Sequence, residues 1–379
     1  MNIECSILFR CDGAPDIGLG HIVRCLALAD ELKKHNIDIF FAMRKGPLGI
    51  KMVEEKGYEV IVSQEESGDF AYGEWLKQCV GQTNAQAIIF DVRDGLSKDV
   101  VKKIREDGVL IVDIDDPEDK RLEADLAFYP PVPQVKRMDW TGFTGKLYSG
   151  WEWVVLRPEF AEWRKKHGIA SDQCTISNNV SFHDQNITTN DDISLRYTPC
   201  NTHKTLNVLV TMGGSDPAGL TLKAVEALNM LPIAFKATIV LGPGFVHKES
   251  LKALLQEVHY EYNILENVSD MVPVMAQADL AVASFGVTAY ELAAMGVPAI
   301  YICLTADHEE SASAFVDAGM ALTLGQYANV GREEISIRIK ELFKKSTFYA
   351  MSHNTSTHMD GLGTIRISNL LEGRLEERR

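Results

Sequence analysis

The chain has 379 residues, which is long for one domain and comfortable for two. Its 53 acidic and 38 basic residues give a net charge of −15, which argues against broad contact with nucleic-acid phosphates. No apolar run reaches the length of a membrane span, and no basic segment followed by a long apolar core opens the chain. We therefore expect a cytoplasmic protein, whose seven cysteines, without a CxxC pair, are free thiols.

Short apolar runs alternate with helical patterns through the first 130 residues. We expect strands at Ser6–Phe9, Ile37–Met43, Glu59–Val62, Ala87–Asp91, Val109–Asp115 and Ala124–Pro130. The helices between them are expected at Ile22–His35, in the segment ending near Gly57, at Trp75–Val80 and at Asp99–Asp107. Apolar strands that alternate with helices predict a parallel sheet covered on both faces.

The same alternation of short apolar runs and helical patterns begins again after residue 206. We expect strands at Asn207–Met212, Ala237–Gly242, Asp279–Ser284 and Ala299–Leu304. Helices are expected at Leu251–Val258, at Thr288–Met295 closed by Gly296, and from Pro217 onward with Asp216 as the cap. The tail from about residue 332 reads as mostly helical, with its last ten residues frayed and solvated.

Residues 168–204 are rich in Asn, Thr, Ser and Asp and have weak periodicity. They read as an irregular linker or surface insertion, and a flap over a binding site is the alternative. The predicted fold class is α/β, with two Rossmann-like domains facing across a cleft: 1–160, a linker at 161–205, 206–345, and a helical tail at 346–379. Ligands collect at the carboxyl ends of parallel strands, so the strand-end loops should point into this cleft.

A glycine-rich turn follows the first expected strand and its Asp12. Gly18 and Gly20 let the backbone bend tightly and approach a ligand. His21 opens a helix whose free N–H groups suit an anion, and its imidazole can act as a base near neutral pH. A hinge or capping histidine without chemistry is the alternative. The GxGxxG motif is not present at this turn, which weakens a dinucleotide interpretation.

The turn TMGGSDP follows the first strand of the second region. Gly213, Gly214 and Ser215 there form a candidate phosphate cradle at a helix N-terminus. The turn lacks the GKT or GKS ending of an ATP-type loop, and an ordinary strand-to-helix turn competes with the phosphate interpretation.

A second strand-to-helix turn in this region offers Ser284, Gly286 and Thr288 to a ligand. Glu291 lies three residues after Thr288, so it either closes a capping box or grips the hydroxyls of a ribose. His308 follows a later strand, as a ligand contact or an ordinary residue of a helix N-terminus.

Four aspartates cluster at the ends of two strands of the first region: Asp91, Asp113, Asp115 and Asp116. Such carboxylates can hold Mg²⁺ or act as general acid or base, but more often they cap helices and shape loops. We expect neither a bound metal nor a cofactor.

The chain resembles the nucleotide-sugar hydrolases of pseudaminic acid biosynthesis and the related spore coat polysaccharide biosynthesis proteins. The resemblance rests on four segments in order: RCDGAPDIGLGHIVRCLALADEL, WVVLRPEF, VLVTMGGSDPAGLT and DMVPVMAQADLAVASFGVTAYELAAMGVPAI. It spans residues 7–325 except the 168–204 insertion. It implies a glycosyltransferase-B-like fold.

The resemblance also implies an activity: release of UDP from a UDP-linked 2,4-diacetamido-2,4,6-trideoxy sugar, without a metal. His21 would activate water for direct, inverting displacement at the anomeric carbon. Gly213, Gly214, Ser215 and the turn from Ser284 to Thr288 would hold the nucleotide, with Glu291 on the ribose.

Two places depart from the hydrolase pattern. Val92, Arg93 and Asp94 stand where hydrolases tend to carry a tyrosine, and His308 and Glu309 follow Asp307 where they carry Asn-Gln. The sugar or the acceptor therefore differs, and a sugar hydroxyl in place of water would make the chain an inverting glycosyltransferase. A non-catalytic nucleotide-sugar-binding protein and a UDP-N-acetylglucosamine epimerase are further alternatives.

Overall fold

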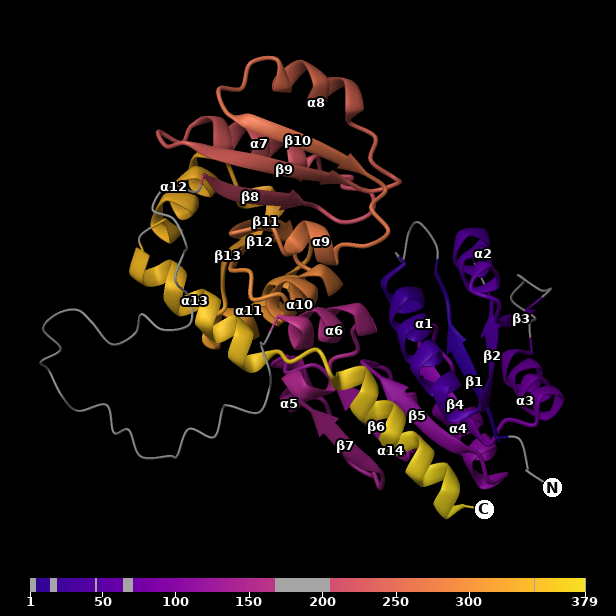
Figure 1. Ribbon diagram of the computed structural model, residues 1–379. Coiled ribbons are helices and arrows are strands. Elements are labelled where there is room, and N and C mark those ends of the chain that lie inside the picture. The colour runs from indigo at the N-terminus through magenta and orange to yellow at the C-terminus, as the bar shows by residue number, and fades with distance from the viewer. Residues whose placement is uncertain are drawn as a thin grey trace, which may run out of the picture.

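The computed structural model describes residues 5–13, 19–44, 46–63, 71–167, 205–343 and 345–378. Two parallel sheets, each covered by helices, form two lobes of an α/β fold (Figure 1). The predicted Gly18 and the 168–204 insertion lie outside the described residues.

The first sheet has seven strands in the order β3-β2-β1-β4-β5-β6-β7. The strands are β1 (Cys5–Cys11), β2 (Ile37–Met43), β3 (Glu59–Val62), β4 (Ala87–Asp91), β5 (Leu110–Ile114), β6 (Leu126–Tyr129) and β7 (Lys146–Ser149). Its helices are α1 (Gly20–Leu32), α2 (Pro47–Glu55), α3 (Tyr72–Thr83), α4 (Lys98–Glu106) and α5 (Gln134–Arg137). The strand order reverses between β1 and β4, which is the place where open parallel sheets bind ligands.

The second sheet repeats this pattern with six strands in the order β10-β9-β8-β11-β12-β13. The strands are β8 (Leu206–Thr211), β9 (Phe235–Leu241), β10 (Glu261–Glu266), β11 (Leu280–Ser284), β12 (Ala299–Cys303) and β13 (Ala321–Gln326). The remaining helices are α6 (Pro158–Lys166), α7 (Leu220–Asn229), α8 (Lys248–Leu255), α9 (Val272–Met275), α10 (Val287–Ala294), α11 (Ala306–Asp317), α12 (Arg332–Leu342), α13 (Lys345–His358) and α14 (Gly363–Glu377). Here the order reverses between β8 and β11.

Apolar side chains on both faces of the central strands explain why these strands pair as a buried parallel sheet. Ile7 and Phe9 of β1 pack in the cluster under α1, whereas Leu8 packs in the cluster under α3 and α4. Because successive side chains of a strand point to opposite faces, a strand covered on both sides must be apolar throughout. The described cysteines, all buried free thiols, fit the predicted reduced state.

The predicted strands are confirmed to within two residues at each end, but β7, β10 and β13 were not predicted. Most residues of β7 and β10 are exposed, so their sequences, KLYS and EYNILE, carry no apolar run. The predicted helix start at Pro217 is wrong, since α7 begins at Leu220. The N-cap is Gly219 instead of the predicted Asp216, although the Asp216 carboxylate accepts hydrogen bonds from the backbone N–H groups of Leu220 and Thr221.

The C-terminal end is helical as predicted, but the expectation of a frayed, solvated end is wrong. Helix α14 returns to the first lobe and lies across its sheet beside α1 (Figure 1). Ile367, Leu371 and Leu375 are buried in the core cluster of that lobe. Thr364, near the start of α14, links this helix to the segment before α6. Its hydroxyl donates to the carbonyl of Leu156 and accepts from the Leu156 N–H. The division of the chain into four segments, drawn from the sequence, stays a prediction.

Asp113 of β5 is a fully buried carboxyl group, and neither of its oxygens has a hydrogen-bond partner within the described residues. Burial, with the neighbouring charge of Asp116, raises the pKa of Asp113 well above its usual value. The folded protein therefore holds a proton that the unfolded chain releases above about pH 4. Stability contributed by this group falls as pH rises.

We predict that Asp113→Asn removes this pH dependence. Relative to the wild type, the variant should gain stability between pH 4.5 and 7.5, by up to about 1.4 kcal/mol per pH unit for one proton. Urea unfolding at both pH values measures the difference, and Asp38→Asn, at an exposed carboxylate of the same sheet, is the control. An equal stability difference at both pH values would contradict the assignment.

Candidate active site

A cavity of about 610 Å³ lies between the carboxyl ends of the two sheets. The first lobe lines it with Asp12, Gly20 and His21 and with loops after β4, β5 and β6. The second lobe contributes residues 285–290 after β11 and 307–311 after β12. The two halves come close at one point: a Cβ atom placed on Gly20 would lie 3.3 Å from Val287 Cγ2. The predicted cleft is thus present, and His21 lies in it.

His21 forms a pair with Asp91, the last residue of β4. The His21 Nδ1 atom lies 2.5 Å from Asp91 Oδ1, and the Asp91 side chain is fully buried while that of His21 is 26% exposed. His21 follows β1 and Asp91 ends β4, so the pair sits where the strand order reverses. The sheet topology brings together two residues that are 70 positions apart in sequence.

Arg24 completes this group. Its Nε atom donates to Asp91 Oδ2 at 2.7 Å, and another guanidinium nitrogen donates to Asp91 Oδ1 at 2.6 Å. Its remaining nitrogen reaches Asp115 at 3.1 Å. Burial alone would raise the pKa of Asp91, but the charges of Arg24 and His21 hold it well below its usual value. Asp91 is therefore an anion throughout the physiological range.

The anionic state of Asp91 sets the protonation of the histidine ring. A carboxylate can only accept a hydrogen bond, so His21 Nδ1 carries the proton in the neutral ring. The second ring nitrogen, Nε2, is then unprotonated and able to take a proton from a bound hydroxyl or water. Asp91 would stabilise the resulting imidazolium, as the buried aspartate of a catalytic triad does. This arrangement would suit a general base.

Asp12, predicted to bind substrate, lines the cavity but is already heavily engaged. Its carboxylate accepts from the buried Arg10 at 2.7 Å and from the backbone N–H of Arg44 at 2.7 Å. Arg10 also donates to Asp94 at 2.8 Å and to the hydroxyl of Tyr72. These contacts tie Asp12 to β1 and to the segment that follows β2.

The predicted phosphate cradle lies outside the lining of this cavity, at the carboxyl end of β8. Gly213, Gly214 and Ser215 are exposed there, and a Cβ atom on Gly213 would lie 3.6 Å from Ser284 Oγ. Gly213 has φ +77°, a left-handed conformation that favours glycine. The carbonyl of Gly214 accepts the N–H of Gly244, from the loop after β9, at 2.8 Å. The strand-end loops of the second lobe therefore gather where its strand order reverses.

Helix α10 carries the other predicted nucleotide contacts. Gly286 lines the cavity as its N-cap, while Thr288 and Glu291 do not line it. Thr288 makes no side-chain cap, so the capping box considered for Glu291 does not form. Glu291 instead accepts from Arg157 at 3.2 Å, and the same guanidinium donates to the carbonyl of Ser269 at 2.9 Å. Arg157 thus ties the segment that leaves the first lobe to the second lobe.

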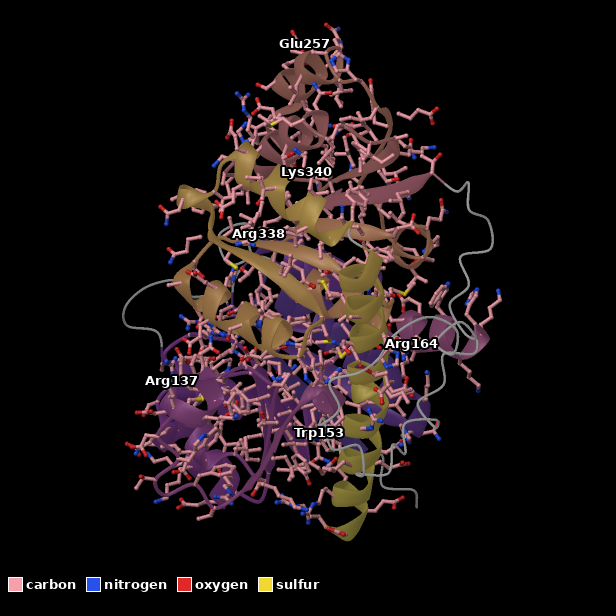
Figure 2. All side chains as sticks on the ribbon, turned by 90° about the vertical axis from the view of Figure 1, so that its left-hand side faces the viewer. Arg137, Trp153, Arg164, Glu257, Arg338 and Lys340 are labelled. Atoms are coloured by element: carbon pink, nitrogen blue, oxygen red, sulfur yellow. The ribbon has the colours of Figure 1, made fainter. Side chains whose placement is uncertain are left out.

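Helix α11 forms the far wall of the cavity and contacts α5 of the first lobe. Gln134 donates to Ser311 Oγ at 2.8 Å and to Asp307 Oδ1 at 3.1 Å. Arg137 pairs with Glu310, at the level where the lobes meet (Figure 2). These contacts join the two lobes along this side of the cavity.

Three of the four aspartates considered as metal ligands form ion pairs with basic side chains. Asp91 is occupied by His21 and Arg24, and Asp115 by Arg24. Asp116 pairs with the buried Lys120 at 2.7 Å, and burial, opposed by Lys120, raises the pKa of Asp116 to about 6. Across the described part of the chain, no group of three or more His, Cys, Asp or Glu side chains is placed to hold a metal ion.

The sequence interpretation missed Arg24 and the partnership of Asp91 with His21. One signal was available, because Arg24 lies three residues after His21 and therefore on the same face of α1. The position of Asp91 at the end of a fully apolar strand was a second signal. Asp91 reaches His21 and Arg24 because β1 and β4 are neighbours in the sheet, and the sequence does not show this pairing.

Comparisons with known proteins agree with this geometry. Residues 207–364 match the model of the glycosyltransferase family 28 C-terminal domain. The chain is 24% identical over 371 residues to the spore coat polysaccharide biosynthesis protein SpsG of Bacillus subtilis (strain 168), covering 97% of both chains. Acinetobacter baumannii MurG superposes with a TM-score of 0.71 at 15% identity, over 97% of this chain and 99% of that one.

A structure of S. aureus MnaA with UDP superposes with a TM-score of 0.62 at 12% identity, over 98% of this chain and 97% of that one. Within the described ranges, no helix combines the length and apolar character needed to cross a bilayer. The chain therefore has the two-domain glycosyltransferase-B fold of these structures, and its residues 207–364 are similar to the glycosyltransferase family 28 C-terminal domain.

Proposed function

We propose that this chain transfers a glycosyl group from a nucleotide sugar to an acceptor hydroxyl, with inversion at the anomeric carbon, in polysaccharide biosynthesis. The observation that carries the proposal is the His21–Asp91 pair in the interlobe cavity. The match to a glycosyltransferase family 28 domain and the likeness to SpsG support the reaction class and the setting.

In the proposed mechanism, His21 Nε2 removes the proton of the acceptor hydroxyl. The acceptor oxygen forms a bond to the anomeric carbon while the bond from that carbon to the phosphate oxygen breaks, and the nucleoside diphosphate leaves with the electron pair. Asp91 stabilises the imidazolium, and Arg24 keeps Asp91 ionised and fixed in position. The cleft aligns the reactants, and closure of the two lobes on the substrate would exclude bulk water.

The nucleotide would lie on the second lobe. Gly213, Gly214 and Ser215 offer backbone and hydroxyl donors to the diphosphate, and Ser284 lies against this turn. Thr288 and Glu291 remain proposed contacts further along the same surface, with Glu291 on the ribose. UDP is the first nucleotide to test, because the S. aureus MnaA structure named above contains UDP. The cytoplasmic location likewise stays a prediction.

Hydrolysis is the second candidate, with water as the acceptor. It is favoured by the four segments that resemble nucleotide-sugar hydrolases, including the one that carries His21. The same general base serves both reactions, so the acceptor alone separates them. The departures at Arg93 and at His308 both lie on the cavity wall, where a sugar or an acceptor would be recognised.

The test is incubation with a panel of UDP-, CDP- and GDP-sugars, followed by phosphorus NMR, with and without glycan acceptors. We expect nucleoside diphosphate release that depends on, or is strongly accelerated by, an acceptor. Equal release without an acceptor would select hydrolysis. Saturable nucleotide binding without any release would indicate a non-catalytic binding protein. A converted sugar that remains nucleotide-linked would indicate an epimerase.

A further inference from the structure

The charged side chains that line the cavity are mostly neutralised by partners. Arg24 is balanced by Asp91 and Asp115, and Asp12 by Arg10. Asp307 keeps its charge and accepts a hydrogen bond from the amide of Gln134. The cavity therefore carries few charges that are free to attract a ligand.

Among the arginines that line the cavity, Arg93 has no such partner in the described part of the chain. It lies two residues after Asp91, lines the cavity, and is exposed to it. No ion pair or hydrogen bond joins its side chain to any other residue that the structure describes. An arginine is always charged and presents five N–H donors in a planar fork, so an unpaired guanidinium in a cleft is suited to an oxyanion.

The opposite wall supports this assignment. His308, at the start of α11, lines the cavity across from the first lobe, and its Nδ1 atom is buried without a hydrogen-bond partner among the described residues. Burial lowers the pKa of His308, and the positive charge of Arg93 lowers it further against the opposing effect of Asp307. A neutral imidazole can donate one hydrogen bond to a ligand without a second charge to balance.

We propose that Arg93 is the oxyanion-binding residue of the cleft and takes a phosphoryl or carboxylate group of the bound substrate, with His308 as the facing hydrogen-bond partner. This inference rests on the proposed function, because it assigns the oxyanion to a nucleotide sugar. Two groups could supply it: the diphosphate that leaves, or a carboxylate on the sugar. In the first case Arg93 also stabilises the negative charge that develops as the diphosphate departs.

The test measures binding without turnover, by isothermal titration calorimetry with inorganic pyrophosphate and, separately, with glucuronate. Arg93→Gln should weaken binding of one probe about 10- to 100-fold, as expected for a lost charge-assisted bidentate contact. Arg93→Lys should lose less, because it keeps the charge but not the fork. Lys98→Gln, at an exposed cation on the first residue of α4 that does not line the cavity, should bind as the wild type does.

The pattern of losses identifies the source of the oxyanion. A loss confined to pyrophosphate assigns Arg93 to the diphosphate, and a loss confined to glucuronate assigns it to a sugar carboxylate. Unchanged binding of both probes by Arg93→Gln, or a wild-type protein that binds neither, overturns the inference. The binding test needs no turnover, so it is independent of the activity assay. If the protein were inactive toward every nucleotide sugar, the proposed function would be rejected, and the calorimetric result for Arg93 would still stand or fall by itself.

Discussion

Replacing His21 with alanine is expected to lower kcat by about 10²- to 10⁴-fold, the usual contribution of a general base. The reason is that the acceptor oxygen is then left without a group to take its proton. The predicted nucleotide loops are on the other lobe, so the Kd for UDP should change less than threefold. Steady-state kinetics and calorimetric titration with UDP measure the two quantities.

The matched control is His353→Ala, at an exposed histidine of α13 far from the cavity lining. It should retain wild-type kcat. His21→Ala should also retain its melting temperature within a few degrees, because the His21 side chain is partly exposed. Wild-type turnover in His21→Ala would reject the general-base assignment.

Asp91→Asn is expected to lower kcat by a similar factor, about 10²- to 10⁴-fold, through the tautomer of His21. An asparagine amide is uncharged and can present its NH₂ to His21 Nδ1, which would shift the ring proton to Nε2. In serine proteases, the same substitution of the triad aspartate costs about 10⁴ in kcat for this reason. KM should change little, since Asp91 is buried beneath the cavity.

This variant also removes the charge that Arg24 pairs with, so a stability measurement must accompany the kinetics. The ¹⁵N chemical shifts of His21 give a readout that a purely structural role would not move. We expect the Nδ1-protonated form in the wild type and the Nε2-protonated form in Asp91→Asn. A folded variant with kcat within threefold of the wild type would contradict the pairing.

The central strands could be predicted from sequence because they are buried on both faces, and such strands read as continuous apolar runs. Exposure removes that signal, which is why β7 and β10 were missed. Helix α14 was taken for a frayed end because its sequence is highly charged. Its few apolar residues, among them Leu371 and Leu375, nevertheless meet the core of the first lobe.

The candidate site, too, could be predicted only in part. The glycine turns and His21 stand out locally, and the rule that ligands bind at strand ends places them on one cleft. The partners of these residues depend on strand order and lobe packing, which no local pattern encodes. Asp91 is 70 residues from His21, and Arg157 is 134 residues from Glu291.

The proposed mechanism depends on one claim: that a base in the first lobe drives a single displacement at the anomeric carbon of a nucleotide sugar. Proton NMR of the first-formed product, recorded before any free sugar mutarotates, tests it most directly. A single displacement predicts an anomeric configuration opposite to that of the nucleotide sugar. A product that retains the configuration would contradict it.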